Sequence, residues 1–363
     1  MSKVWRVGLV GLSRGSAYGN LAYRNPRFDI VALCDSSERA LATYRKEFNL
    51  PDSQCFTDYE DFIHKSPLDA VIIGTPIPVH AEQAMLALDA GVNVMSEVTA
   101  SNTIEGCAGI VKAARRSGKI YMLAENTIYR PLFSEWEKIT KSGRLGEIIY
   151  AEADYLHPIP SLLIDPGTGE KKWRADRFPV HYCSHSIGPI LHLTGDRIVR
   201  AMAIGDGHRI MPEVPAGGID IQLAVFETEK KMIIKMTRTQ VAPRHPPIHY
   251  YHILGTNGFI ETDRLGTDPE EHIQRGLLYI KSEMDHAQRV GWQEIDKSLP
   301  DFALLGGHGT CDYSTFLQFL RALDTGEKPA LDEVRAWDLT VPGLVAAESA
   351  LQGGKWMDVP SPE

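Results

Sequence analysis

The sequence predicts an α/β N-terminal Rossmann domain with a doubly wound parallel sheet, followed by an α+β C-terminal domain with a mostly antiparallel open sheet. Up to about residue 125, short apolar runs alternate with amphipathic stretches of roughly ten residues, which is typical of a parallel sheet with crossover helices. Beyond that point several strand-like runs follow one another with little helix between them. We therefore place the domains at 1–125 and 126–363, with C-terminal helices that can pack back on the first domain.

The first domain is predicted from apolar runs that are nearly uninterrupted, as expected for parallel strands buried on both faces. The expected strands are 4–10, 30–34, 70–74, 93–96 and 120–124. The helices expected between them are 16–23, 37–48, 80–90 and 104–117.

The second domain begins with an expected helix at 132–141. The strands predicted after it are 147–155, 198–204, 219–226, 232–239, 250–254 and 259–262. Glu229-Lys230 and Asn257-Gly258 are predicted hairpin turns. Helices are expected at 313–325 and 331–352, the second broken or kinked by Pro342. Residues 158–176 form a long loop that contains Pro and Gly, and such loops often border binding sites.

Composition excludes several classes of function. The chain of 363 residues carries a formal net charge of −9 and has no segment rich in Lys and Arg, which argues against nucleic acid or an anionic membrane surface as a partner. It has no apolar run of about 18 residues and no signal-peptide pattern at its start. The five cysteines are scattered without a CxxC pair. We therefore expect a cytoplasmic protein without disulfides or a thiolate metal site.

A glycine-containing turn follows the first predicted strand, in the position of a dinucleotide-binding fingerprint. It reads Gly11-Leu12-Ser13-Arg14-Gly15-Ser16. Gly11 meets the need for a tight turn, after which helix amides can approach a pyrophosphate. Ser13 and Ser16 replace the second and third glycines of the fingerprint. Gly15, one residue before the position of the third glycine, restores the backbone freedom that a glycine gives. We expect Gly11, Ser13, Arg14 and Gly15 to bind the cofactor, although a Rossmann-like domain that binds another nucleotide, or none, stays open at this point.

Asp35 strengthens the case for a nicotinamide cofactor. It ends the second predicted strand, at the distance from Gly11 where an acidic side chain accepts both ribose hydroxyls. A 2′-phosphate would meet this negative charge, and Ser36-Ser37 supply no arginine to offset it. The prediction is NAD, with NADP disfavoured.

Several further segments resemble one known family, the Gfo/Idh/MocA oxidoreductases, which include glucose–fructose oxidoreductase and inositol dehydrogenase. The resemblance spans nearly the whole chain, and in its second half it is closest to the branch that contains NAD-dependent glycosidases. The segments that carry it are Gly74-Thr75-Pro76 followed by His80, Ser96-Glu97-Val98-Thr99, Ala124-Glu125-Asn126, Trp173-Arg174, residues 182–189, and Gly306-Gly307-His308-Gly309.

The resemblance implies an NAD(P)-dependent enzyme for a sugar-like substrate, with the nicotinamide facing the open sheet of the second domain. It also implies homodimers or homotetramers built through that sheet. The resemblance also assigns the family's residue roles to the matching positions of this chain. Thr75, Pro76 and His80 would line the cofactor path, and Glu97 and Asn126 would lie near the nicotinamide ribose.

Two departures from the family pattern bear on the chemistry. The family's Glu-Lys-Pro motif, whose lysine helps to remove the substrate hydroxyl proton, reads Glu97-Val98-Thr99 here, and valine cannot carry a proton. The family's Asp-x-x-x-His reads His181 to His185, so a histidine stands in place of the aspartate. Either another base acts or hydride chemistry has been lost.

Three residues are candidates for proton transfer, namely His185, Tyr182 and His181. Hydride removal from a secondary alcohol needs a base within reach of the hydroxyl, and histidine exchanges protons near physiological pH. His185 aligns with the family histidine and opens an apolar helix, so we assign it as general acid/base. Tyr182 can share the proton or simply pack. His181 and His185 have the spacing of a metal pair, but no HExxH glutamate accompanies them, and we expect no metal.

Four residues are expected to contact the substrate, although each could instead anchor a loop. An indole can stack on the C–H face of a sugar, and guanidinium or imidazole groups can bind its hydroxyls. These residues are His157, Trp173, Arg174 and His308.

The leading hypothesis is NAD-dependent oxidation of a ring hydroxyl of a sugar, glycoside or cyclitol. The alternative is a glycoside-cleaving or eliminating enzyme with tightly bound NAD, in which oxidation is transient. The third hypothesis, motivated by Val98, is a non-catalytic NAD-binding protein.

Overall fold

Residues 3–362 are described by a computed structural model, in which the chain divides into two units. The first unit comprises the chain up to Tyr129 together with Lys297–Trp337. The second comprises Arg130–Asp296 and Asp338–Ser361. The first unit thus takes in a C-terminal segment that lies far beyond residue 125 in the sequence.

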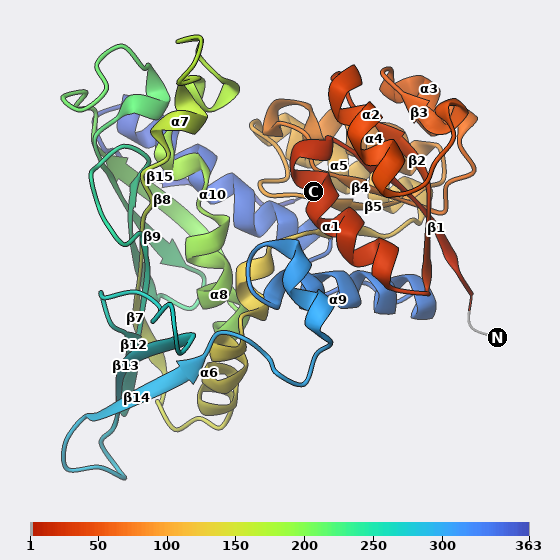
Figure 1. Cartoon of the computed structure of the whole chain (residues 1–363). Helices are drawn as coiled ribbons and strands as arrows, with labels where there is room; N and C mark the ends of the chain where they lie inside the picture. The colour runs from red at the N-terminus through yellow and green to blue at the C-terminus, as the bar shows by residue number, and fades with distance from the viewer. Residues whose placement is uncertain (1–2, 363) are drawn as a thin grey trace. The chain divides into compact units, whose positions relative to one another are not determined.

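The first unit is built on a six-stranded parallel sheet with the order β3-β2-β1-β4-β5-β6 (Figure 1). Its strands are β1 (Trp5–Val10), β2 (Phe28–Cys34), β3 (Cys55–Phe56), β4 (Ala70–Ile73), β5 (Asn93–Ser96) and β6 (Tyr121–Leu123). Strand order reverses between β1 and β4, and ligands of doubly wound sheets bind at the carboxyl ends of the strands at such a switch point. The predicted Rossmann fold is confirmed.

The helices of this unit connect the parallel strands, apart from those contributed by the C-terminal segment. They are α1 (Leu12–Arg24), α2 (Glu38–Glu47), α3 (Tyr59–Lys65), α4 (His80–Asp89), α5 (Ile104–Ser117), α9 (Cys311–Thr325) and the start of α10 (Glu333–Leu351). The prediction that the first helix starts at residue 16 was wrong. Gly11 adopts a left-handed conformation with φ of 74°, so α1 begins immediately after the turn.

The second unit is built on a nine-stranded sheet with the order β14-β13-β12-β11-β7-β10-β9-β8-β15 (Figure 1). Only β7 and β10 pair in parallel, so the sheet is mostly antiparallel, as predicted. Both predicted hairpin turns join antiparallel neighbours. The strands are β7 (Ile148–Leu156), β8 (Ile198–Ile204), β9 (Gln222–Thr228), β10 (Ile233–Thr239), β11 (Ile248–Gly255), β12 (Gly258–Thr262), β13 (Ile273–Ile280), β14 (Gln288–Gln293) and β15 (Met357–Asp358).

Helices α6 (Pro131–Lys141) and α8 (Ser184–Thr194) lie on one face of this sheet, and α7 (Pro160–Leu163) interrupts the long loop (Figure 1). Strands β13 and β14 were not predicted. In β13 a glycine breaks the apolar pattern at Gly276, where a Cβ would overlap the carbonyl oxygen of Glu261 on the neighbouring strand.

Of the two effects expected of Pro342, a break or a kink in the last helix, the break is absent, because α10 continues through Pro342 to Leu351. The neighbouring Gly343 packs against the segment before α8. A Cβ there would lie 2.7 Å from the sulfur of Cys183, so the helix is held in close contact with the segment before α8. Among residues 3–362, no helix is long and apolar enough to cross a membrane.

Candidate active site

The turn after β1 brings the backbones of three glycines close together. A Cβ on Gly11 would overlap the amide nitrogen of Thr75, and a Cβ on Gly74 would overlap the amide nitrogen of Gly15. A Cβ on Gly15 would lie 3.1 Å from the carbonyl oxygen of Val10. Gly15 therefore allows the close helix–strand packing that the third fingerprint glycine provides. Gly11, the N-cap residue of α1, has no side chain with which to bond the first amides of the helix, so this turn fits the phosphates of a dinucleotide.

Asp35 lies at the end of β2, beside this turn. Its Oδ2 accepts a hydrogen bond of 2.7 Å from the amide of Leu12, and its Oδ1 accepts one of 2.8 Å from the amide of Ser37. Each carboxylate oxygen can accept more than one hydrogen bond, so ribose hydroxyls can still bind. The side chain thus orders the start of α1 and keeps a negative charge near the expected ribose.

Replacing Asp35 with asparagine is expected to weaken discrimination against NADP. The amide keeps the size of the side chain but removes the charge that opposes a 2′-phosphate, so the ratio of Kd for NADP to Kd for NAD should fall by about tenfold or more. Fluorescence titration of both nucleotides measures this ratio. An unchanged ratio would mean that Asp35 does not face the ribose.

Arg14, in the first turn of α1, forms the centre of a charged network within the first unit. Its Nε lies 2.6 Å from Oε1 of Glu97, and its Nη2 lies 3.1 Å from Oδ1 of Asp312. Asp312 is fully buried and also accepts hydrogen bonds from Asn126 Nδ2 at 2.6 Å and from His308 Nδ1 at 3.0 Å. The network joins four of the predicted residues, Arg14, Glu97, Asn126 and His308, through one carboxylate that was not predicted.

The network determines the charge of its members. Burial acts against the charged form of Arg14, but the carboxylates of Glu97 and Asp312 outweigh it and raise its pKa. Burial alone would raise the pKa of Asp312; the hydrogen bond from His308 and the charge of Arg14 lower it to about 2. The carboxylate is therefore ionised at neutral pH and holds the loop before α9 against the start of α1.

Replacing Asp312 with asparagine is expected to destabilise the fold. The folded-state pKa lies below its unfolded value of 3.8, so the wild-type carboxylate contributes stability above about pH 4 and loses it as the pH falls toward 2. That shift corresponds to roughly 2 kcal/mol, which the variant should lack at pH 7. Urea unfolding at several pH values measures it. Asp61→Asn, which removes only the exposed pair with Lys65, is the control and should cost under about 0.5 kcal/mol.

The remaining predicted cofactor residues lie around the ends of β4 and β5. His80 is buried, and its two ring nitrogens lie 2.9 Å from the carbonyl oxygen of Thr99 and 2.7 Å from that of Thr75. Pro76 is exposed beside them. His80 therefore ties the loop after β4 to the loop after β5, whereas Val98 is buried and offers no proton-transferring group.

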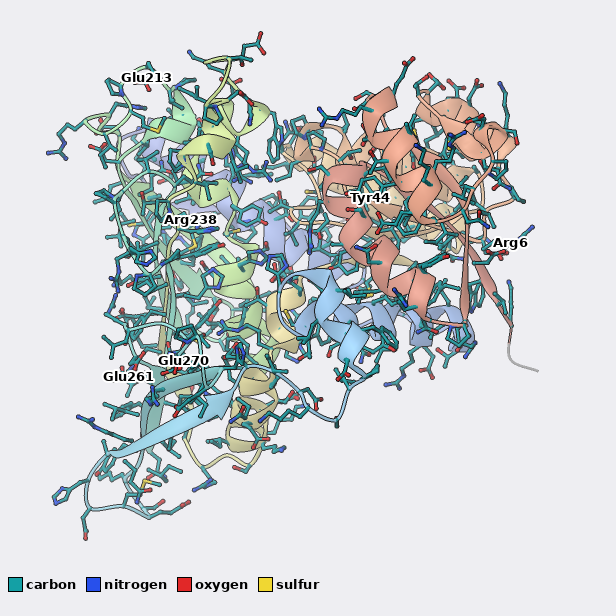
Figure 2. The ribbon with its side chains drawn as sticks, viewed as in Figure 1. Arg6, Tyr44, Glu213, Arg238, Glu261 and Glu270 are labelled. Carbon is teal, nitrogen blue, oxygen red and sulfur yellow. The ribbon has the colours of Figure 1, made fainter. Side chains whose placement is uncertain are left out.

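In the second unit, three side chains form a row across adjacent strands. Arg238 of β10, Tyr155 of β7 and His249 of β11 occupy paired positions and so point to the same face of the sheet. The guanidinium carbon of Arg238 lies 3.8 Å from the centre of the Tyr155 ring, and the ring centres of Tyr155 and His249 lie 3.5 Å apart. Figure 2 shows Arg238 among the strands of this sheet. We call this set the Tyr155 row.

Three predicted residues gather around the Tyr155 row. The hydroxyl of Tyr155 is 2.8 Å from Nδ1 of His157. The ring of His185, at the start of α8, lies 4.9 Å from that of Tyr182 and 6.0 Å from that of Tyr155. Tyr251 donates a hydrogen bond of 2.5 Å to the carbonyl oxygen of His185, which fixes the first turn of α8 on the sheet. His185, Tyr182 and His157 are all partly exposed.

His181 lies in a short 3₁₀ turn before α8 rather than on its face. Burial and the positive charge of Arg177 lower its pKa to about 3, so it is neutral near pH 7 and poorly matched to proton transfer there. Among the described residues no group of three or more His, Cys, Asp or Glu side chains is placed to hold a metal ion.

Trp173 and Arg174 lie in the long loop after β7. The guanidinium carbon of Arg174 is 4.2 Å from the centre of the Trp173 ring. A small apolar cluster of Leu163, Ala175, Val214 and Val241 packs beneath the loop and holds it in place.

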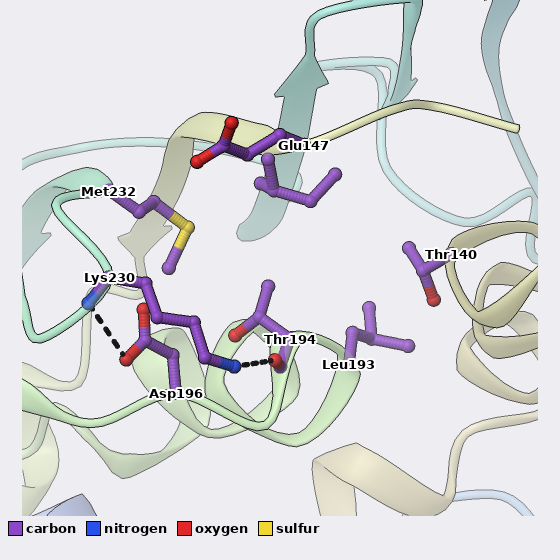
Figure 3. A pocket seen from close by; sticks show the side chains of 8 residues that line it. Thr140, Glu147, Leu193, Thr194, Asp196, Lys230 and Met232 are labelled. Atoms are coloured by element: carbon purple, nitrogen blue, oxygen red, sulfur yellow. Dashed lines mark hydrogen bonds between the residues drawn. The ribbon is translucent and has the colours of Figure 1, made fainter. Parts of the chain in front are cut away.

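A separate pocket in the second unit, of about 170 Å³, lies at the other end of α8 (Figure 3). Thr194 lines it and lies nine positions beyond His185 in α8, or about 14 Å along the helix. Lys230 Nζ donates to the carbonyl oxygen of Thr194 at 3.1 Å, and its backbone amide donates to Asp196 at 3.4 Å (Figure 3). Lys230, Thr194 and Asp196 of this pocket thus bind one another, and we assign the pocket no role in catalysis.

Sequence reasoning missed Asp312, Arg238, Arg177, Tyr155 and His249. One local signal was present, because His308 and Asp312 are four residues apart at the start of a predicted helix. Arg238, Tyr155 and His249 are brought together by strand register, which the sequence alone did not determine. Arg177 lies outside the strands, directly after the 3₁₀ turn Trp173–Asp176.

Comparison with known proteins assigns the family. Residues 5–125 match the model described as the oxidoreductase family with an NAD-binding Rossmann fold, and residues 133–261 match the GFO/IDH/MocA C-terminal domain. The chain belongs to the Gfo/Idh/MocA oxidoreductase family. Its first unit is therefore an NAD-binding domain, in agreement with the glycine turn and Asp35.

Proteins similar to this Gfo/Idh/MocA member fall into two groups. A glycosyl hydrolase family 109 protein of Shewanella sp. (strain W3-18-1) is 27% identical, over 95% of this chain and 82% of that protein. A levoglucosan dehydrogenase in complex with NADH and L-sorbose has a similar structure, with a TM-score of 0.83 at 18% identity over 99% of this chain and all of that one. An inositol dehydrogenase homologue from Azotobacter vinelandii, with NADH and myo-inositol, has a TM-score of 0.79 at 18% identity over 98% of each chain.

Proposed function

We propose that this Gfo/Idh/MocA protein oxidises a ring hydroxyl of a sugar, glycoside or cyclitol, with NAD as cofactor. The observation that carries the proposal is the position of His185, held by the Tyr251 hydrogen bond beside Tyr182 and the Tyr155 row. The names of the similar structures, a levoglucosan dehydrogenase and an inositol dehydrogenase homologue, support substrates of this kind.

The chemistry is assigned to residues of this chain as follows. The Gly11 turn holds NAD, which supplies the acceptor for the hydride that leaves the carbinol carbon. His185 accepts the hydroxyl proton, in place of the lysine that Val98 replaces. Tyr182 orients the hydroxyl, and the bond between Tyr155 and His157 provides a route for the proton to a partly exposed imidazole. Trp173 and Arg174 contact the sugar from the loop.

Glycoside cleavage is a second candidate function, favoured by the relatives named as glycosyl hydrolase family 109 proteins and by Val98. Oxidation of a ring carbon acidifies the neighbouring C–H, so loss of that proton can expel the aglycone by elimination. Water then adds to the double bond, and reduction of the carbonyl restores the alcohol. The same residues serve both reactions, which differ in whether reduced cofactor accumulates.

Incubation of the purified protein with NAD and a panel of glycosides and polyols tests the proposal. A dehydrogenase releases NADH and an oxidised product, whereas the second candidate releases aglycone from a chromogenic glycoside with no net NADH. If neither product forms on any member of the panel while NAD binds, the protein is a non-catalytic NAD-binding protein and the proposal fails.

We also propose that the protein forms a homodimer or homotetramer through the sheet face opposite α6 and α8. Ile204 and Ile233 are respectively 51% and 36% exposed on that face. Sedimentation equilibrium tests this proposal, and a monomer would contradict it.

The five cysteines, none in a disulfide, support the proposal of a reducing, cytoplasmic setting.

A further inference from the structure

Two arginines of the second unit are buried without a carboxylate partner. Arg177 is 6% exposed and Arg238 is 1% exposed. Within residues 3–362, no Asp or Glu forms an ion pair with either of them. Such an arrangement is rare, because a buried charge is costly unless an opposite charge and hydrogen bonds compensate it.

The contacts that these arginines make leave several donors unused. Arg177 Nη2 donates to Gln240 at 2.9 Å, and Arg238 Nη1 donates to the carbonyl oxygen of Tyr155 at 3.1 Å. Buried nitrogens with no hydrogen-bond partner remain, namely Nε and Nη1 of Arg177, Nε of Arg238, Nδ1 of His181 and Nε2 of His249. The three arginine nitrogens can only donate hydrogen bonds, so the group that completes this cluster must supply acceptors.

Aromatic rings supply part of the missing stabilisation but no negative charge. The guanidinium carbon of Arg177 lies 4.5 Å from the centre of the Tyr182 ring and 5.3 Å from that of Trp173. The guanidinium carbon of Arg238 lies 5.4 Å from the same Tyr182 ring. Burial, together with the charges of Arg174 and Arg238, lowers the pKa of Arg177, which agrees with a cation that lacks its counter-charge.

The two arginines adjoin the proposed catalytic residues. Tyr182 contacts both arginines and also His185, and Tyr155 contacts Arg238 and His185. Tyr155, Tyr182 and His185, which border the two buried arginines, remain partly exposed. A group bound by the arginines would therefore belong to the same molecule as the hydroxyl that His185 deprotonates.

We propose that the substrate is an acidic sugar, whose carboxylate or phosphate is bound by Arg177 and Arg238. The inference rests on the proposed function, because it names the substrate class of the same site. The anion provides the acceptors and the charge that the cluster lacks, and a neutral sugar leaves both cations uncompensated.

The test compares substrates that differ in charge but hardly in shape. NAD-loaded wild-type protein is assayed with methyl glucuronide, galacturonide and mannuronide, with the neutral methyl ester of each, and with the corresponding 6-phosphates. We expect kcat/KM for one anionic series to exceed that for its neutral counterparts by about tenfold or more, since a neutral group cannot form charge-assisted hydrogen bonds with the two guanidinium groups. The uronides and the phosphates distinguish the two kinds of anion.

Substitutions of Arg177 test whether this residue causes the preference for anionic substrates. Arg177→Gln is expected to raise KM for the anionic substrate by about tenfold or more, with little effect on its methyl ester, and Arg177→Lys should partly restore it. Arg289→Gln, which changes an exposed arginine of β14, is the control and should leave the kinetics unchanged. If Arg177→Gln does not fold, the wild-type comparison still decides.

Each outcome separates this inference from the proposed function. Equal or better turnover of neutral sugars overturns the inference and leaves the dehydrogenase proposal intact. Calorimetric binding of uronide or phosphate that needs Arg177, without oxidation of any substrate, supports the inference and overturns the dehydrogenase. If the protein neither binds nor turns over any of the anions, the inference is overturned.

Discussion

Replacement of His185 by glutamine is expected to lower kcat by about 10²- to 10⁴-fold, the usual contribution of a positioned general base. Glutamine keeps a polar side chain of similar reach but cannot accept the hydroxyl proton at neutral pH. Because NAD binds in the first unit, its Kd should change little. Stopped-flow absorbance of NADH formation measures the chemical step, and fluorescence titration measures cofactor affinity.

The matched control for this variant is His192→Gln. His192 lies two turns further along α8 and is placed near Glu137 rather than the Tyr155 row. It should retain wild-type kcat. If His185→Gln keeps wild-type kcat, or if both variants lose activity equally, His185 is not the base.

Replacement of Gly11 by alanine is expected to reduce NAD affinity by about 100-fold or more, because the turn must open to relieve the overlap with Thr75 and the helix amides then move away from the phosphates. The variant also has a left-handed alanine, which costs about 1 kcal/mol by itself. Isothermal titration with NAD and with ADP-ribose measures the loss at the phosphate end of the cofactor.

Gly118→Ala separates the two effects. Gly118 caps α5 with φ of 63°, and a Cβ there meets no atom within 4 Å. This control therefore introduces the same backbone strain without the overlap, and it should be slightly less stable while binding NAD normally. Wild-type affinity in Gly11→Ala would show that the turn does not hold the cofactor.

The elements of the first unit could be predicted from sequence because their signals are local. Asn93–Ser96 and Ile104–Ser117 have the predicted bounds, since an apolar run and a threonine cap followed by a C-terminal glycine define them. The start of α1 was missed because the left-handed conformation of Gly11 is not visible in composition. The inclusion of residues 297–337 in the first unit depends on buried contacts such as that between Arg14 and Asp312.

The candidate site was only partly predictable for the same reason. His185, Tyr182 and His157 belong to segments with a recognisable pattern. The Tyr155 row depends on the parallel register of β10 against β7, and a shift of one residue would turn Arg238 to the other face. The lack of a counter-charge for Arg177 and Arg238 is a property of tertiary structure, so the sequence indicated a sugar site without indicating its charge.

One measurement tests the central claim most directly, a single-turnover reaction of NAD-loaded protein with the sugar panel, including the uronides deuterated at each carbinol carbon. Transfer of a hydride from a ring carbon predicts reduced cofactor that carries deuterium from one labelled position, formed at a rate that falls sharply in His185→Gln. This signal appears whether the reduced cofactor is released or used again. Substrate that is cleaved without deuterium in the cofactor, or no reaction of any sugar with protein that binds NAD, would contradict the account.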